Sequence, residues 1–73
     1  MTAQILSIQQ VVDRVEEIRR VANDDPRAHA LEDHLWEDVL ETIVSGHISL
    51  HASIQMCRVA LTTKDIEFAR WRE

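Results

Sequence analysis

The chain has few of the residues that end helices or cross-link small folds. It contains one glycine, one proline, one cysteine and no tyrosine. A single cysteine excludes a disulfide within the chain, and one glycine with one proline is too few for a turn-rich β protein. Frequent Ala, Leu, Glu, Gln and Arg favour helix instead. The composition therefore predicts an all-α protein.

Long hydrophobic runs and a secretory leader are missing as well. No stretch approaches the roughly 18–20 apolar residues that cross a bilayer, and the first residues lack a basic region followed by an apolar core. Thirteen acidic residues against eight Lys or Arg give a net charge of −5, which works against direct binding to nucleic acid. With one unpaired thiol, we expect a cytoplasmic protein that binds neither membrane nor nucleic acid.

Three helices are predicted from the hydrophobic spacing and from the breaks between apolar segments. Pro26 cannot continue a helix but suits the first turn of the next one, with Asp24 or Asp25 as its cap. A second break falls at Gly46. The helices are expected at about residues 3–21, 26–44 and 48–61. The fold is therefore predicted to be an all-α three-helix bundle, a single domain over residues 1–73, with the C-terminal tail packed back on the bundle.

Each of the last two predicted helices has an apolar face that we expect to point inward. In the second helix it comprises Ala28, Leu31, Leu35 and Val39, broadened by Trp36, Leu40 and Ile43. In the third helix it comprises Leu50, Ile54, Cys57 and Leu61. We expect Trp36 to pack in the core with its indole N–H at a polar edge. Cys57 is interpreted as a buried structural residue rather than a nucleophile.

The first predicted helix has the most regular pattern in the chain. Its apolar residues alternate spacings of three and four from Ile8 to Ala22, and this 3.5-residue period keeps one side of a helix toward a partner. The partner is the other two helices, a second copy of the chain, or both. Exposure of Leu6 and Val12 in the monomer would favour a dimer. We assign homo-oligomerisation, with a dimer favoured, to Ile8, Val11, Val12, Val15 and Ile18.

The second predicted helix concentrates negative charge. Its acidic face comprises Glu32, Asp33, Glu37, Asp38 and Glu41. Like charges four residues apart repel by a few tenths of a kcal/mol, so the helix tolerates a cost there. The face is either a docking surface for a basic protein, a mimic of nucleic-acid phosphates, or an ordinary solvated face partly paired with arginines of the first helix or the tail.

Metal and nucleic-acid sites fit the sequence less well. His29, Asp33 and Glu37 share one helix face, but a tight metal site usually converges from two or more elements. His47 and His51 have the spacing of a helical metal clip without the intervening Glu of zinc proteases. A helix-turn-helix is disfavoured because the segment after the second break carries a single Arg. We assign no catalytic, cofactor-binding or metal-binding residue and expect a protein that is not an enzyme.

The C-terminal tail is rich in large apolar residues for its length. Ile66, Phe68 and Trp71 stand in the last ten residues. We assign the anchoring of the tail to Phe68, Arg70 and Trp71. Trp71, which is flanked by two arginines, is either a lid on the core or an anchor in an interface. Arg70 is expected to pair with Glu32 or Asp33 on the second helix.

Two segments also carry a resemblance to a known group of proteins. Residues 28–35 (AHALEDHL), followed by Val39–Leu40, and residues 68–71 (FARW) resemble small acidic proteins encoded by actinobacteria and their phages, which share an AHxxEDxL…VL helix and an FxRW ending. The resemblance covers roughly residues 24–71 and leaves the first helix outside. It implies no catalytic residues, and it implies a role as an accessory modulator of host or phage proteins.

The patterns together favour a non-enzymatic protein–protein interaction module. An apolar seam supplies affinity in such a module, and a charged helix supplies choice of partner and speed of encounter. The alternative is an acidic mimic or inhibitor that occupies a basic or nucleic-acid-binding surface of a partner protein.

Overall fold

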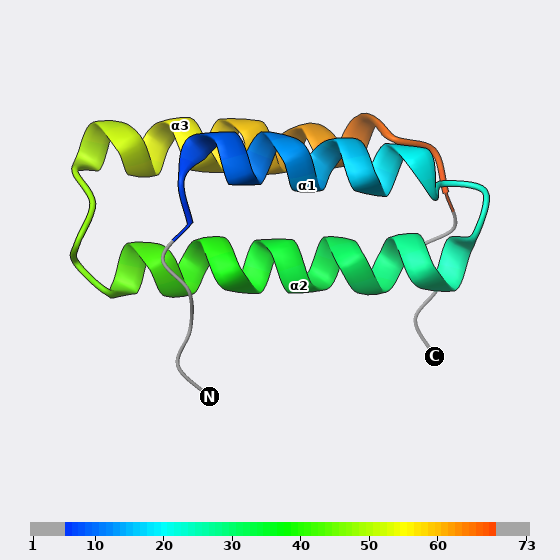
Figure 1. Cartoon of the computed structure of the whole chain (residues 1–73), viewed down its shortest axis with the longest axis horizontal. Coiled ribbons are helices and arrows are strands. Elements are labelled where there is room, and N and C mark those ends of the chain that lie inside the picture. The colour runs from blue at the N-terminus through cyan, green and yellow to red at the C-terminus, as the bar shows by residue number, and fades with distance from the viewer. Residues whose placement is uncertain (1–5, 69–73) are drawn as a thin grey trace.

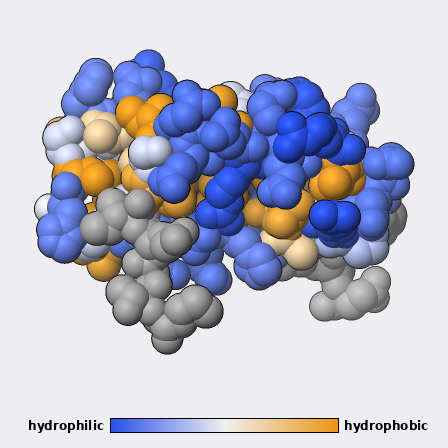
Figure 2. All heavy atoms as spheres, viewed as in Figure 1, coloured by the Kyte–Doolittle hydropathy of each residue, from blue (hydrophilic) through white to orange (hydrophobic). Residues whose placement is uncertain are grey.

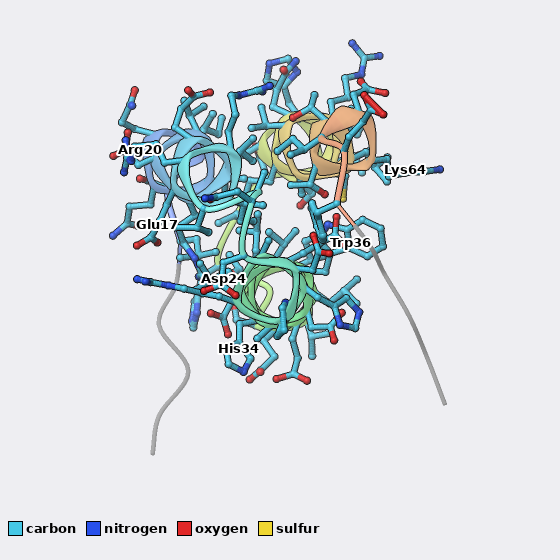
Figure 3. The ribbon with its side chains drawn as sticks, turned by 90° about the vertical axis from the view of Figure 1, so that its right-hand side faces the viewer. Glu17, Arg20, Asp24, His34, Trp36 and Lys64 are labelled. Carbon is cyan, nitrogen blue, oxygen red and sulfur yellow. The ribbon has the colours of Figure 1, made fainter. Side chains whose placement is uncertain are left out.

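The computed structural model describes residues 6–68, which form three α-helices and a short 3₁₀ helix. The elements are α1 (Ile8–Arg20), α2 (Asp25–Val44), α3 (Leu50–Leu61) and the 3₁₀ helix η1 (Thr62–Asp65). α1 and α3 run in the same direction, and α2 runs antiparallel to both (Figure 1). Seen along their axes, the three helices occupy the corners of a triangle (Figure 3). The predicted three-helix bundle is confirmed.

Each α-helix begins at a side-chain cap. Ser7 Oγ accepts a hydrogen bond from the backbone N–H of Gln10 (3.2 Å), and the Gln10 side chain accepts one from the backbone N–H of Ser7 (2.8 Å). This capping box satisfies two backbone donors at the start of α1. The predicted start near residue 3 is wrong because Ser7 is extended and the helix follows it. Residues 3–5 lie outside the described part of the chain.

The other two helix starts follow the same rule. Asp24 caps α2 by accepting a hydrogen bond from a backbone N–H of the first turn, and Pro26 lies in that turn, as predicted. α3 begins at Leu50 rather than residue 48, because Ser49 is its extended cap. Between α2 and α3, Gly46 has a φ of +75°, which a residue without a Cβ adopts at no steric cost. Local sequence therefore sets all three boundaries.

The core lies along the axis between the three helices. Its buried apolar side chains are Leu6, Val11, Val15, Ile18, Ala28, Leu35, Val39, Met56, Ala60 and Ile66. The backbone N–H of Leu6 donates to Thr42 Oγ1 (3.1 Å), which ties the segment before α1 to α2. After η1, Ile66 is buried and Phe68 packs against the core. The described part of the tail therefore lies back on the bundle, while Arg70 and Trp71 lie outside the described residues.

The inner face of α3 differs from the prediction. Met56 and Ala60 are its buried residues, whereas Leu50, Ile54 and Leu61 are exposed. α3 carries apolar residues on more than one side, and the side that holds small Ala60 packs inward and continues into η1, where Thr63 is buried. α2 shows a similar difference at Leu40, which points outward and is 61% exposed.

The side of the molecule that faces the viewer in Figure 1 has α1 in front of α3 and above α2. Hydrophilic side chains cover most of this side, with smaller apolar areas between them (Figure 2). Within residues 6–68, no helix is long and apolar enough to cross a membrane.

Candidate interaction surface

Most of the exposed large apolar side chains lie on α2 and α3. Among residues 6–68, six of the seven such side chains belong to these two helices. We define the apolar α2–α3 face as Trp36, Leu40, Val44, Leu50, Ile54, Cys57 and Leu61. Val44 and Leu50 are the most open, at 84% and 77% exposure. Contiguous apolar patches on a small protein typically mark a surface that binds another molecule.

Helix periodicity and antiparallel packing bring these residues together. The three residues from α2 are spaced four apart, and those from α3 are spaced by four, three and four; both spacings keep side chains on one side of a helix. Because α2 and α3 are antiparallel, Val44 lies at the end of α2 where α3 begins, and Trp36 lies toward the end of α3. α2 and α3 pack less closely against each other than either packs against α1, so the face stays open between them.

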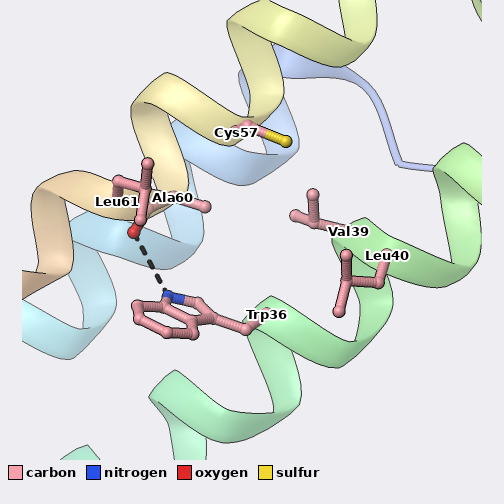
Figure 4. A pocket seen from close by; sticks show the side chains of 6 residues that line it. All are labelled: Trp36, Val39, Leu40, Cys57, Ala60 and Leu61. Atoms are coloured by element: carbon pink, nitrogen blue, oxygen red, sulfur yellow. Dashed lines mark hydrogen bonds between the residues drawn. The ribbon is translucent and has the colours of Figure 1, made fainter.

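A pocket of about 170 Å³ lies within the apolar α2–α3 face (Figure 4). Its lining residues are Trp36, Val39, Leu40, Cys57, Ala60 and Leu61. Pockets for cofactors and drug-sized ligands usually measure about 300–1,000 Å³, so this one is of a size for a single side chain. Cys57 lines it as well; it is half-buried and packs against the core, so the prediction of a buried structural cysteine is confirmed only in part.

Trp36 forms one wall of this pocket and joins α2 to the end of α3. Its Nε1–H donates to the Ala60 carbonyl (3.3 Å) and to Thr63 Oγ1 (3.2 Å). Thr63 is fully buried, and its hydroxyl donates to the same carbonyl (3.0 Å). The expectation of a polar partner for the indole N–H is confirmed. The expectation of a core position is wrong, because the ring is 36% exposed and lies between α2 and α3 on the side away from α1 (Figure 3).

The five residues of the predicted acidic face have different environments. Glu32 is buried, at 5% exposure. Asp38 is half-buried and pairs with Arg14 of α1, with Oδ2 2.7 Å from Nη1. The remaining three, which we call the acidic row, are exposed: Asp33, Glu37 and Glu41. The predicted acidic face is thus reduced to the acidic row, because Asp38 is paired with α1 and Glu32 is buried.

The acidic row borders the apolar α2–α3 face. Each of its members stands three residues before an apolar member of α2, so that Asp33, Glu37 and Glu41 precede Trp36, Leu40 and Val44. Residues three apart are neighbours on a helix surface. The outer edge of the face along α2 is therefore negatively charged.

The outer edge along α3 has the opposite character. His51 and Arg58 are exposed, and they stand three residues before Ile54 and Leu61. By the same geometry they border the α3 half of the face. Arg58 carries a permanent positive charge. The apolar α2–α3 face thus has an acidic edge on one helix and a basic edge on the other.

The residues assigned to self-association through the first helix lie mostly inside the monomer. Val11, Val15 and Ile18 are buried against the other helices. Val12 is half-buried, and Ile8, at 38% exposure, is the open member of the set. Leu6, whose exposure would have favoured a dimer, is also buried. The seam therefore contacts the chain's own helices, and its three buried side chains cannot meet a second copy while the bundle stays folded.

The candidate metal residues do not form a cluster. His29 Nε2 lies 3.7 Å from Asp33 Oδ2 one helical turn away. His47 lies in the turn before α3 and not on the helix of His51. Among residues 6–68, no group of three or more His, Cys, Asp or Glu side chains is placed to hold a metal ion.

We compared the chain with models of known protein families, with curated proteins and with solved structures. None of them matches. The resemblance to small actinobacterial and phage proteins therefore stays a prediction.

The sequence patterns missed the site although they contained a signal for it. Leu50, Ile54 and Leu61 were assigned to the core, and Val44 was assigned to no face. α3 has a second apolar set, Met56, Val59 and Ala60, on its other side. A helix that is apolar on two sides has one side more than a small three-helix core requires. That surplus was the signal in the sequence that one apolar side of α3 is exposed.

Proposed function

We propose that the chain is a non-enzymatic protein–protein interaction module that binds through the apolar α2–α3 face. The observation that carries the proposal is the exposure of apolar side chains along two adjacent antiparallel helices. Burial of apolar surface is the main favourable term in protein association. The spacing of four, three and four on α3 is that of a helix seam, so the face fits a helical partner.

The central pocket supports this function. Trp36 is held by two hydrogen bonds, so its ring is fixed before a partner arrives. Rigid aromatic side chains beside a pocket are typical of the residues that dominate binding energy in interfaces. A partner side chain that enters the pocket would contact apolar groups of both helices at once.

The acidic row supports a second candidate, an acidic mimic or inhibitor that occupies a basic or nucleic-acid-binding surface of another protein. Asp33, Glu37 and Glu41 are exposed and evenly spaced. The row holds three carboxylates rather than the five predicted, because Glu32 is buried and Asp38 pairs with Arg14. It also borders a larger apolar surface. We therefore favour the apolar α2–α3 face as the source of affinity and the acidic row as a guide to partner choice.

Affinity capture from a lysate of the host organism tests the proposal. The bait is the purified chain, and the test variant is Leu40→Glu, which places a charge in the centre of the face. The matched control is Ile8→Glu, which places the same charge at an exposed aliphatic residue of α1. We expect proteins that bind the native chain and Ile8→Glu but not Leu40→Glu. Equal capture by all three baits overturns the proposal. So does a native chain that captures no more protein than Leu40→Glu captures.

A fourth bait separates the two candidates. Reversal of the acidic row, with Asp33, Glu37 and Glu41 changed to lysine, leaves the apolar face intact. A mimic loses its partner entirely in this variant and weakens steeply with salt, because exposed charges are screened within about 8 Å at physiological ionic strength. An interaction through the apolar face persists in high salt.

A further inference from the structure

We propose that the apolar α2–α3 face binds a second copy of this chain, with α2 of each copy packed against α3 of the other. The inference rests on the proposed interaction function and names the partner. It moves self-association from the first helix, whose seam is buried in the monomer, to the opposite side of the bundle.

The charges at the two edges of the face select this arrangement. The α2 edge carries the acidic row, and the α3 edge carries His51 and Arg58. A two-fold axis parallel to the helices places α2 of one copy opposite α3 of the other, so each acidic edge meets a basic edge. The alternative axis, across the helices, places α2 opposite α2 and brings the two acidic rows together. Like-charge juxtaposition disfavours such a pairing, whereas opposite edges attract.

The arrangement also brings together residues that lie at the same height, that is, at the same position along the bundle axis. In the monomer, Leu40 of α2 and Cys57 of α3 line the same pocket, which places them near each other along the bundle axis. Glu37 borders Leu40 on the outside of α2, and Arg58 directly follows Cys57 on α3. A two-fold axis parallel to the helices preserves height, so Glu37 of one copy lies near Arg58 of the other, and the contact occurs twice in the dimer.

The apolar α2–α3 face fits a helical partner whose apolar residues have the same spacing of three and four. Pairing of the two faces gives four helices around a new apolar centre, with antiparallel neighbours on every side. Short antiparallel helices with seams spaced by three and four residues pack in this way in four-helix bundles. An interface of standard size takes about 800 Å² from each partner, which is about 15% of the 5249 Å² surface of this chain.

Charge reversal at Glu37 and Arg58 tests the arrangement. The native chain, Glu37→Lys, Arg58→Glu and the double variant are studied by sedimentation equilibrium over a wide range of concentration at low salt. Each single reversal turns two attractive edge contacts into repulsive ones, and we expect the dimer dissociation constant to rise about tenfold. The double variant restores opposite charges in both contacts, and its dissociation constant should return to within about threefold of the native value. Thermal melts followed by circular dichroism confirm that all four chains are folded.

Three results overturn this proposal. A native chain that is monomeric at every concentration shows that a second copy does not bind the face. A dimer that Glu37→Lys strengthens shows that α2 packs against α2. A dimer that none of the three variants changes lies elsewhere on the surface. Because this experiment uses the purified chain alone, a monomeric result leaves the capture of a different protein as a separate test of the interaction function.

Discussion

Arg14 on α1 and Asp38 on α2 form an ion pair across the interface of these helices, with Nη1 2.7 Å from Oδ2. The pair joins the helix with two arginines in its last turn to the helix with the acidic face. It removes one carboxylate from the surface that a basic partner could contact. It also shows why charge counts along one helix overestimate a charged surface, since the neighbouring helix supplies the compensating group.

A double-mutant cycle measures this pair. We expect Arg14→Met and Asp38→Asn to couple by up to about 1 kcal/mol in the free energy of unfolding, because both side chains are partly exposed to water. The coupling should decrease in high salt. Urea denaturation of the four chains gives the value, and a coupling of zero at low salt would show that the pair does not contribute.

A buried hydroxyl is expected to matter more. Thr42 is 1% exposed, and its Oγ1 accepts a hydrogen bond from the Leu6 backbone and donates one to the Asp38 carbonyl (2.8 Å). Thr42→Val keeps the shape but leaves the Leu6 N–H buried without its acceptor, which costs about 1–3 kcal/mol. Thr62→Val is the matched control, because Thr62 is exposed, and we expect a change within about 0.5 kcal/mol. Equal effects in chemical denaturation would contradict the assignment.

The hydrogen bonds of Trp36 are testable in the same way. Trp36→Phe removes the indole N–H and leaves Thr63 Oγ1, in a fully buried residue, without this donor. We expect a loss of about 1 kcal/mol in the free energy of unfolding. The ring contributes less than a core aromatic residue would because it is partly exposed. A loss of 3 kcal/mol or more, the scale of a deleted core aromatic side chain, would instead place the ring in the core.

Two identical substitutions separate the core from the apolar α2–α3 face. Leu35 is fully buried, whereas Leu50 is 77% exposed. Leu35→Ala should destabilise the fold by about 2–5 kcal/mol, and Leu50→Ala should change it by no more than about 0.5 kcal/mol. Both are measured by urea denaturation at low protein concentration, where association does not contribute. A large loss of unfolding free energy for Leu50→Ala would show that Leu50 faces the core, as the sequence predicted.

The sequence predicted the bundle well because its boundaries are local. Pro26, Gly46 and the capping residues act within one turn, so their effect can be read without the tertiary structure. The stripe of α1 was equally clear, since Val11, Val15 and Ile18 follow one another at spacings of four and three on a helix whose outer face is polar. The sequence did not show what this stripe packs against, because a helix seam has the same pattern whether it contacts the same chain or a second copy.

The orientation of α3 could not be read from the pattern. Leu50, Ile54 and Leu61 are larger than Ala60 and more hydrophobic, so they were the natural choice for the core. The structure turns Met56 and small Ala60 inward instead, and buried Thr63 accepts the Trp36 N–H. Such preferences depend on the distance between two helices, which single-sequence periodicity does not contain.

We propose that the chain associates through the apolar α2–α3 face and not through α1. Sedimentation equilibrium of Ile54→Glu and Ile8→Glu tests it most directly, because the two isoleucines have similar exposure, 43% and 38%, on different helices. We expect the native chain and Ile8→Glu to show a mass that rises with concentration and Ile54→Glu to remain monomeric. Association that survives Ile54→Glu and is lost in Ile8→Glu would place the interface on α1 and not on the apolar α2–α3 face.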